Sequence, residues 1–238
     1  MKQLFIILFL LIPSFTFASN SPPISWRQIK IILDKEIYKS HRTTLYCSAT
    51  FNKLREISLP VGFETTKYID IAQNLDWEHV VPAQNFGQSF KEWQEGHPSC
   101  VKNGKPFKHR DCVELVNINY QYMQIDMHNI YPAIASVNRL RSNYNFRMLP
   151  DVESNFGSCQ MKIFNRKAEP PINSRGQIAR SYLYMDKTYK RYNMSDQQKQ
   201  LMNAWNKMYP PNPWECERAK LIEQIHPFRC PLRVSGAY

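Results

Sequence analysis

Six cysteines in a chain that begins like an exported protein place the strongest constraint on how it can fold. Residues 1–18 carry a charged start and a short apolar run that ends in small residues, a pattern typical of a cleaved secretory signal. The run is well short of the roughly 20 residues that a membrane helix needs, and Pro13 interrupts it. We therefore expect a signal peptide over 1–18 and one mature domain over 19–238, periplasmic or extracellular and not held in a membrane.

An even number of cysteines in an exported chain predicts disulfides. The cysteines are Cys47, Cys100, Cys112, Cys159, Cys216 and Cys230. No two of them stand at the short separation that structural zinc sites use, so zinc is disfavoured as their partner. Proximity suggests Cys100 with Cys112 and Cys216 with Cys230, but the sequence alone leaves the pairing open.

The formal net charge of +11 predicts a basic surface. Such a charge serves solubility or attraction to an acidic cell envelope. It also suits a polyanionic partner, because lysines and arginines that neutralise phosphates release condensed counterions and so bind nucleic acid whatever its sequence.

The apolar pattern predicts a single, mostly helical α+β domain without internal repeats or linkers. Helices are expected over 24–38, 130–141, 178–192 and 214–225, and another after Ser195, where Ser195 and Gln198 make a capping box. A strand is expected over 75–81, running into a loop that Pro82 breaks. Residues 46–74 give no firm assignment, and 94–111 are expected to form a surface loop.

Two short segments carry the polar groups that suggest chemistry. Glu78 precedes His79 in a mostly apolar stretch, at the end of the expected strand, where both side chains can face one cleft. Asn129 and, nine residues on, Asn138 add amide groups. A histidine can take a proton from water near neutral pH, and carboxylate and amide oxygens suit a hard cation such as Mg²⁺. These are the parts of a metal-dependent phosphodiesterase.

The order of the motifs resembles that of the secreted endonuclease I family, which are nonspecific nucleases of the ββα-metal (His-Me finger, HNH-like) superfamily. The resemblance covers roughly residues 24–228. It rests on the segments 77–83, 127–134, 137–138, 141–144, 175–180, 182–185 and 203–207. It implies a disulfide-stabilised α+β domain around a ββα-metal core.

The resemblance also implies a role for each site residue. His79 matches the general base that activates water, and Glu78 and Asn138 match the side-chain ligands of a single divalent ion, Mg²⁺ with Mn²⁺ or Ca²⁺ as substitutes. Asn129 matches the asparagine that braces the loop carrying the histidine. The implied substrates are DNA and RNA, cleaved without sequence specificity to leave 5′-phosphate ends, and we expect the protein to act as a monomer.

One position departs from the family pattern. Its members usually carry an arginine after the segment 93–96, where it contacts the scissile phosphate, but here the chain reads His97. The role would then pass to another cation, or to none, in which case the cleavage rate should suffer. The candidates are Lys102, Lys105 and Arg110 in the same loop, and Arg141; for binding the phosphate backbone the candidates are Arg175, Arg180, Lys102 and Arg110.

Two other classes of function remain open from the sequence. A zinc phosphoesterase would use His41, His97, His109 and His128 with Glu78, although these histidines lack the short spacing of a zinc cluster. A basic protein that binds nucleic acid or the envelope without turnover would also fit the charge and the missing arginine.

Overall fold

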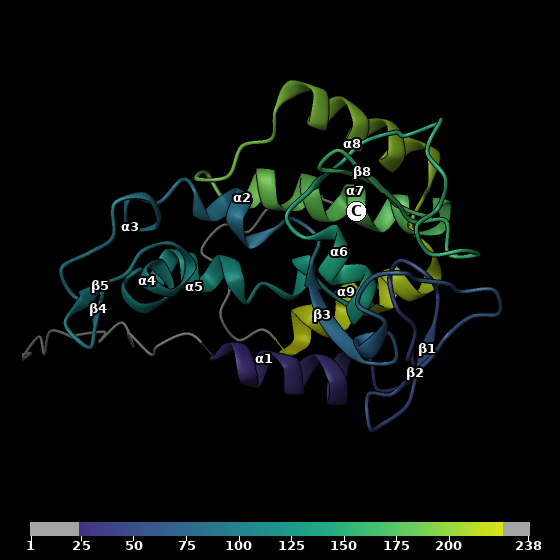
Figure 1. The fold of residues 1–238 in the computed structure, drawn as a ribbon, viewed down its shortest axis with the longest axis horizontal. Coiled ribbons are helices and arrows are strands. Elements are labelled where there is room, and N and C mark those ends of the chain that lie inside the picture. The colour runs from purple at the N-terminus through teal and green to yellow at the C-terminus, as the bar shows by residue number, and fades with distance from the viewer. Residues whose placement is uncertain (1–23, 226–238) are drawn as a thin grey trace, which may run out of the picture.

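A computed structural model describes residues 24–225 of the chain. The expected signal peptide, Cys230 and the other residues at the two ends lie outside this range. The described part is mixed α+β, as predicted, with many helices and short strands (Figure 1). Within residues 24–225, no helix has both the length and the apolar character needed to cross a bilayer.

The helices and strands of residues 24–225 follow one another in an irregular order. The α-helices are α1 (Trp26–Ile32), α2 (Ala83–Gly87), α3 (Lys91–Gln94), α4 (His109–Val116), α5 (Ile118–Gln124), α6 (Ala135–Arg141), α7 (Ile172–Thr188), α8 (Asp196–Met208) and α9 (Pro213–Ile225). The other turns of helix are η1 (Leu33–Ile37), η2 (Ile69–Ile71) and η3 (Met127–Asn129). The strands are β1 (Thr50–Phe51), β2 (Ile57–Ser58), β3 (Leu75–His79), β4 (Val101–Lys102), β5 (Lys105–Pro106), β6 (Ile130–Ile134), β7 (Asn145–Phe146), β8 (Lys162–Phe164) and β9 (Lys167–Glu169).

The helices near the C-terminal end are close to those predicted. Helix α8 starts after Ser195, whose hydroxyl accepts a hydrogen bond from the Gln198 backbone nitrogen at 3.3 Å, and α9 ends at Ile225 as expected. Helix α7 begins six residues earlier than predicted and packs along α8, which lies above it in Figure 1. Gly176 lies in this helix where a Cβ atom would come within 2.4 Å of the Tyr209 carbonyl oxygen, so the close packing requires glycine.

The prediction of one helix over 130–141 is wrong in its first half. Residues Ile130–Ile134 form strand β6, which pairs antiparallel with β3, and α6 begins only at Ala135. All five strand residues are buried, so the alternation that marks a half-exposed strand is missing from the sequence. Pro132 is tolerated because each strand of a two-stranded sheet is an edge.

The loop expected over 94–111 is mostly irregular but contains the β4–β5 hairpin and the start of α4. The short helices between Ala83 and Gln124 had no counterpart in the prediction. These helices are too short for a long row of apolar residues to repeat at helical spacing, so their sequences carry little periodic signal.

Two disulfides lie within the described residues. Cys100 pairs with Cys112, which confirms the pairing suggested by proximity, and Cys47 pairs with Cys159 across 112 residues, which the sequence had left open. Cys216 is exposed and has no disulfide partner among residues 24–225. Its expected partner, Cys230, lies outside them, so the third bond stays a prediction.

The two disulfides are expected to stabilise the fold unequally, because the entropy removed from the unfolded chain grows with the length of the closed loop. For loops of 112 and 12 residues, this entropy term differs by roughly 2 kcal/mol of unfolding free energy. We predict that replacing Cys47 and Cys159 together by serine lowers the melting temperature about 4 to 8 °C more than replacing Cys100 and Cys112. Calorimetry of the two double variants checks this, and equal losses would contradict it.

Candidate active site

Strands β3 and β6 and helix α6 form one β-β-α unit, in which α6 contacts both strands. Asp76 and Glu78 are two residues apart on β3 and therefore point to the same face of the sheet. Asn138 and Arg141 are three residues apart on α6 and therefore lie on one side of the helix. Hydrogen bonds join the two pairs, Asn138 to Asp76 and Arg141 to Glu78, so these four side chains meet between the helix and the sheet.

The Asn138 side chain has a defined orientation. Its amide nitrogen Nδ2 lies 2.7 Å from Asp76 Oδ2. Because a carboxylate accepts hydrogen bonds, the NH₂ group must face Asp76. The carbonyl oxygen Oδ1 of Asn138 is thereby left for another partner.

Glu78 is buried, at 1% exposed, and is bonded from two sides. The Tyr46 hydroxyl and the Arg141 Nη1 atom both donate to Glu78 Oε1, each at 2.6 Å. Burial raises the pKa of the Glu78 carboxyl to about 7, while the Arg141 guanidinium and the Tyr46 hydrogen bond act in the opposite direction. Burial acts to lower the pKa of Arg141, but the charge of Glu78 helps to keep that pKa above its ordinary range, so the guanidinium stays charged in the interior.

His79 is also buried, and its imidazole ring is held by a hydrogen bond at one edge and by an aromatic ring stacked on its face. The ring nitrogen Nε2 lies 2.7 Å from the Gln124 carbonyl oxygen, and the Trp26 indole stacks on the imidazole with 4.7 Å between ring centroids. Because a carbonyl only accepts, Nε2 must carry the proton, and in the neutral ring Nδ1 then has the lone pair. Burial, followed by the positive charge of Arg110, lowers the pKa of His79 to about 3, so the ring is neutral at physiological pH.

Asn129 braces the end of strand β3. It is fully buried, its Oδ1 accepts from the Val81 backbone nitrogen at 2.7 Å, and its Nδ2 donates to the Val81 carbonyl at 2.9 Å. The Val80 nitrogen also donates to the Asn129 backbone carbonyl at 3.0 Å. These contacts fix the chain just after His79, so Asn129 is a positioning residue in this arrangement.

Arg141 does not lie where a phosphate could reach it. Its side chain is 1% exposed, and besides Glu78 it donates to the backbone carbonyls of His79 at 2.9 Å and Val80 at 2.5 Å. The guanidinium also packs over the Phe146 ring. The expectation that Arg141 replaces the missing loop arginine is therefore corrected, because the side chain is buried and both of its terminal nitrogens, Nη1 and Nη2, already donate inside the protein.

Arg175 and Arg180, expected on the nucleic-acid surface, instead hold helix α7 to its neighbours. Arg175 is 9% exposed and donates to Glu169 at 2.6 Å. Arg180 forms an ion pair with Glu215, with its Nη2 atom 2.6 Å from the carboxylate, and donates to the Tyr209 carbonyl. Each charge is already compensated by a carboxylate, so neither arginine is placed to bind the phosphate backbone.

Lys102 and Arg110 remain accessible. Lys102 is exposed on β4, and Arg110 on α4 is 42% exposed, with a long ion-pair distance of 4.0 Å to Glu114. Arg110 is also the cation outside the buried cluster whose charge acts on His79. Of the expected loop cations, Arg110 is therefore the one that the structure relates to the site.

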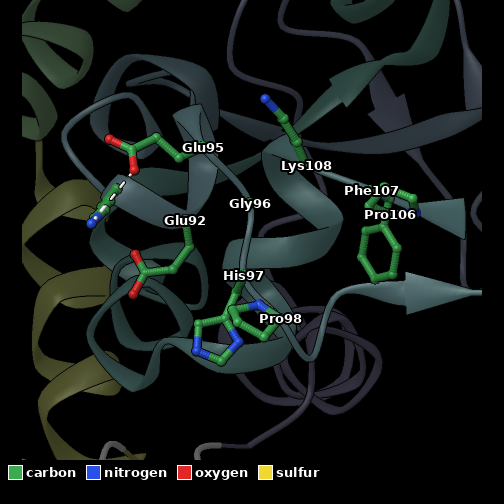
Figure 2. Close-up of a pocket in the computed structure, with 9 residues that line it drawn as sticks. Glu92, Glu95, Gly96, His97, Pro98, Pro106, Phe107 and Lys108 are labelled. Carbon is green, nitrogen blue, oxygen red and sulfur yellow. Dashed lines mark ion pairs between the residues drawn. The ribbon is translucent and has the colours of Figure 1, made fainter.

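His97, which stands where the family pattern has an arginine, lines a surface hollow of about 420 Å³ between α3 and the β4–β5 hairpin. Figure 2 shows Glu92 and Glu95 on one side of this hollow, with His97 below them and Lys108 opposite. Lys91 and Lys108 also line the hollow, and Lys91 lies 3.5 Å from Glu95, so the charges of the two carboxylates and the two lysines balance there. The hollow contains neither Glu78 nor His79 and is separate from the site on β3.

The histidines of the zinc alternative do not gather. His41 stacks on Trp214, and His128 contacts Tyr184. His97 lies in the loop after α3, and His109 begins α4 and lies against Trp93. Among residues 24–225, no three side chains of histidine, cysteine, aspartate or glutamate come together as a metal site. The structure thus gives a zinc phosphoesterase no ligand cluster in that range.

Sequence reasoning missed several groups around the site. Tyr46 lies 32 residues before its partner Glu78, and the Gln124 carbonyl lies 45 residues after His79, so no local pattern joins them. Asp76 could have been found, because it precedes Glu78 by two positions on a predicted strand and must share its face.

Comparison with known proteins places these motifs in a family. The pattern of one family, Endonuclease I, matches residues 28–232. The chain is 35% identical over 209 residues to a periplasmic deoxyribonuclease of Aeromonas hydrophila, covering 84% of this chain and 81% of that protein. It is 35% identical over 205 residues to Endonuclease-1 of Buchnera aphidicola subsp. Acyrthosiphon pisum (strain APS), covering 83% and 76%. An extracellular deoxyribonuclease of Aeromonas hydrophila is 35% identical over 197 residues, covering 79% and 80%.

The burial of Arg141 leads to a stability prediction. Replacing Arg141 by alanine would leave the Glu78 carboxylate buried without its counter-charge, which costs about 3 to 5 kcal/mol of unfolding free energy. The matched control is Arg147→Ala, because Arg147 is exposed and its side chain is hydrogen-bonded only to Gln197 among the described residues, so the change should alter stability by about 0.5 kcal/mol or less. Urea unfolding measures both, and similar small losses would show that the Arg141 pair contributes little.

Proposed function

The chain belongs to the Endonuclease I family, and from this we propose that it is an exported endonuclease that hydrolyses DNA, and RNA, without sequence specificity and with one divalent cation. Membership makes the chain a nuclease, and relatives named periplasmic and extracellular support export. The observation that carries the proposed chemistry is the β-β-α unit, which sets His79 beside Glu78 at the end of one strand and Asn138 on the helix that packs against it.

The oxygen atoms at this unit fit a hard cation. Oδ1 of Asn138 is turned away from Asp76, and Oε2 of Glu78 receives no hydrogen bond from the described residues. One carboxylate and one amide oxygen suit Mg²⁺, or Mn²⁺ or Ca²⁺, which complete their shells with water and phosphate oxygens. When bound there, the cation would neutralise charge on the phosphate and on the departing oxygen.

His79 would act as the general base. With Nε2–H held by the Gln124 carbonyl, Nδ1 is the atom that can accept a proton from water. The pKa of His79 is low in the protein without substrate. The negative charge of a bound phosphodiester would favour the protonated ring and so raise the pKa of His79. Attack by this water would leave a 5′-phosphate and a 3′-hydroxyl.

Arg110 is the cation that we assign to the phosphate in place of the missing loop arginine. It is partly exposed, its ion pair with Glu114 is loose, and its charge acts on His79. Lys102 would add attraction to the backbone from the hairpin. Contacts to phosphates carry no base information, so cleavage by a monomer should be nearly independent of sequence.

The central test is a plasmid assay with purified mature protein. We predict nicking in Mg²⁺ that chelator abolishes, and a loss of about 100-fold or more in His79→Ala because the general base is removed. His97→Ala is the matched control and should cleave normally, since His97 lies in the separate hollow. Glu78→Ala and Asn138→Ala should weaken cleavage more than they weaken DNA binding in chelator.

Other outcomes of the same assay would point elsewhere. A gel shift with intact plasmid under all metal conditions would indicate a binding protein without turnover. Full activity of His79→Ala would remove the proposed base.

The assignment of Arg110 makes a separate prediction. Arg110→Ala is expected to lower the cleavage rate at least about tenfold, because one charged contact to the transition state is lost. Lys102→Ala removes an exposed charge of the same sign farther from the chemistry and should mainly weaken binding at higher salt. Initial rates at saturating DNA separate the two effects, and equal rates for both variants would contradict the assignment.

A further inference from the structure

The hydrogen bonds to Glu78 are not shared between its two oxygens. Tyr46 and Arg141 both donate to Oε1 at 2.6 Å, and none of the described residues donates to Oε2. A carboxylate oxygen has two lone pairs in the plane of the group. Both lone pairs of Oε1 are therefore occupied, and a cation could bind there only by displacing a donor.

Tyr46 is held firmly enough to impose this orientation. Its side chain is 2% exposed and lies against the Phe146 ring, with 6.2 Å between centroids. The preceding residue, Leu45, donates from its backbone to the Pro132 carbonyl on β6 at 2.8 Å, and the following residue, Cys47, is bonded to Cys159. The phenol is thus fixed on both sides along the chain.

The two donors have different parts in holding Glu78. Arg141 supplies the counter-charge that makes burial of the carboxylate possible. Tyr46 is neutral and must be the donor in its bond to a carboxylate, so it adds direction without charge.

We propose that Tyr46 is a positioning residue that, together with Arg141, turns Glu78 so that Oε2 alone is offered to the cation as a monodentate ligand. The inference rests on the proposed function, because it concerns the same cation site. Asn138 follows the same logic, since Asp76 holds its NH₂ group and leaves Oδ1. In each ligand side chain, the protein then holds one polar atom by hydrogen bonds and leaves the other, Oε2 of Glu78 or Oδ1 of Asn138, to face the cation.

The test is Tyr46→Phe, which removes only the hydroxyl. Titration of the mature protein with Mn²⁺, followed by the electron paramagnetic resonance signal of the free ion, gives the affinity and the number of sites together. We expect the affinity to fall about tenfold, as is typical when an outer partner of a ligand is removed, with the number of sites unchanged. The Mg²⁺ concentration that half-saturates cleavage should rise by a similar factor, with most of the rate recovered at saturation.

Tyr120→Phe is the matched control. Tyr120 is likewise buried, but its hydroxyl has no hydrogen-bond partner among residues 24–225, so its removal should leave Mn²⁺ affinity unchanged. A defect in folding would lower the number of sites and the melting temperature in chelator without moving the affinity. Unchanged affinity in folded Tyr46→Phe would overturn the inference.

Two further measurements separate this inference from the proposed function. If Glu78→Ala binds Mn²⁺ as well as the wild type, the cation site itself has failed. The unmodified protein gives an independent check: infrared difference spectra between Mg²⁺-loaded and chelator-treated samples should show the wide separation of carboxylate stretches of a monodentate ligand. A narrow, bidentate separation would overturn the inference even if Tyr46→Phe did not fold.

Discussion

The buried ion pair between Arg141 and Glu78 is the interaction on which the rest of the site depends. Both side chains are almost completely enclosed, and the guanidinium also donates to the carbonyls of His79 and Val80. One side chain on α6 therefore compensates the charge on β3 and fixes the backbone where the strand ends. Because a buried charge without a partner is costly, any arrangement that separates α6 from β3 is disfavoured.

Other buried polar side chains complete this framework. Asn129 satisfies both backbone groups of Val81, and Arg218 on α9 donates to the carbonyls of Met127, the first residue of η3, and Ile130, the first residue of β6. Irregular chain at the ends of β3 and β6 thus has its hydrogen bonds supplied by protein rather than water. Such an arrangement holds the polar groups of the site in place before any substrate arrives, which is the condition for efficient electrostatic stabilisation.

The sequence predicted the local parts of the site better than their surroundings. The adjacent Glu78 and His79 do lie at the end of a strand, and Asn138 does project from a helix. The helix expected from Ile130 was wrong at its start, because a strand buried on both faces shows no alternation. The arginines were the largest error: Arg175 was expected on the surface and pairs with Glu169 instead. A sequence shows that a residue is charged but not which carboxylate lies next to it.

What the sequence determined by itself were features set by neighbouring residues: the capped helix after Ser195, the short disulfide between Cys100 and Cys112, and the order of motifs that marks the family. Tertiary structure alone decided that Tyr46 meets Glu78, that Gln124 meets His79 and that Cys47 meets Cys159. The physical reason is that caps, turns and short loops depend on a few consecutive residues. Burial and charge pairing instead depend on packing between segments far apart in the chain.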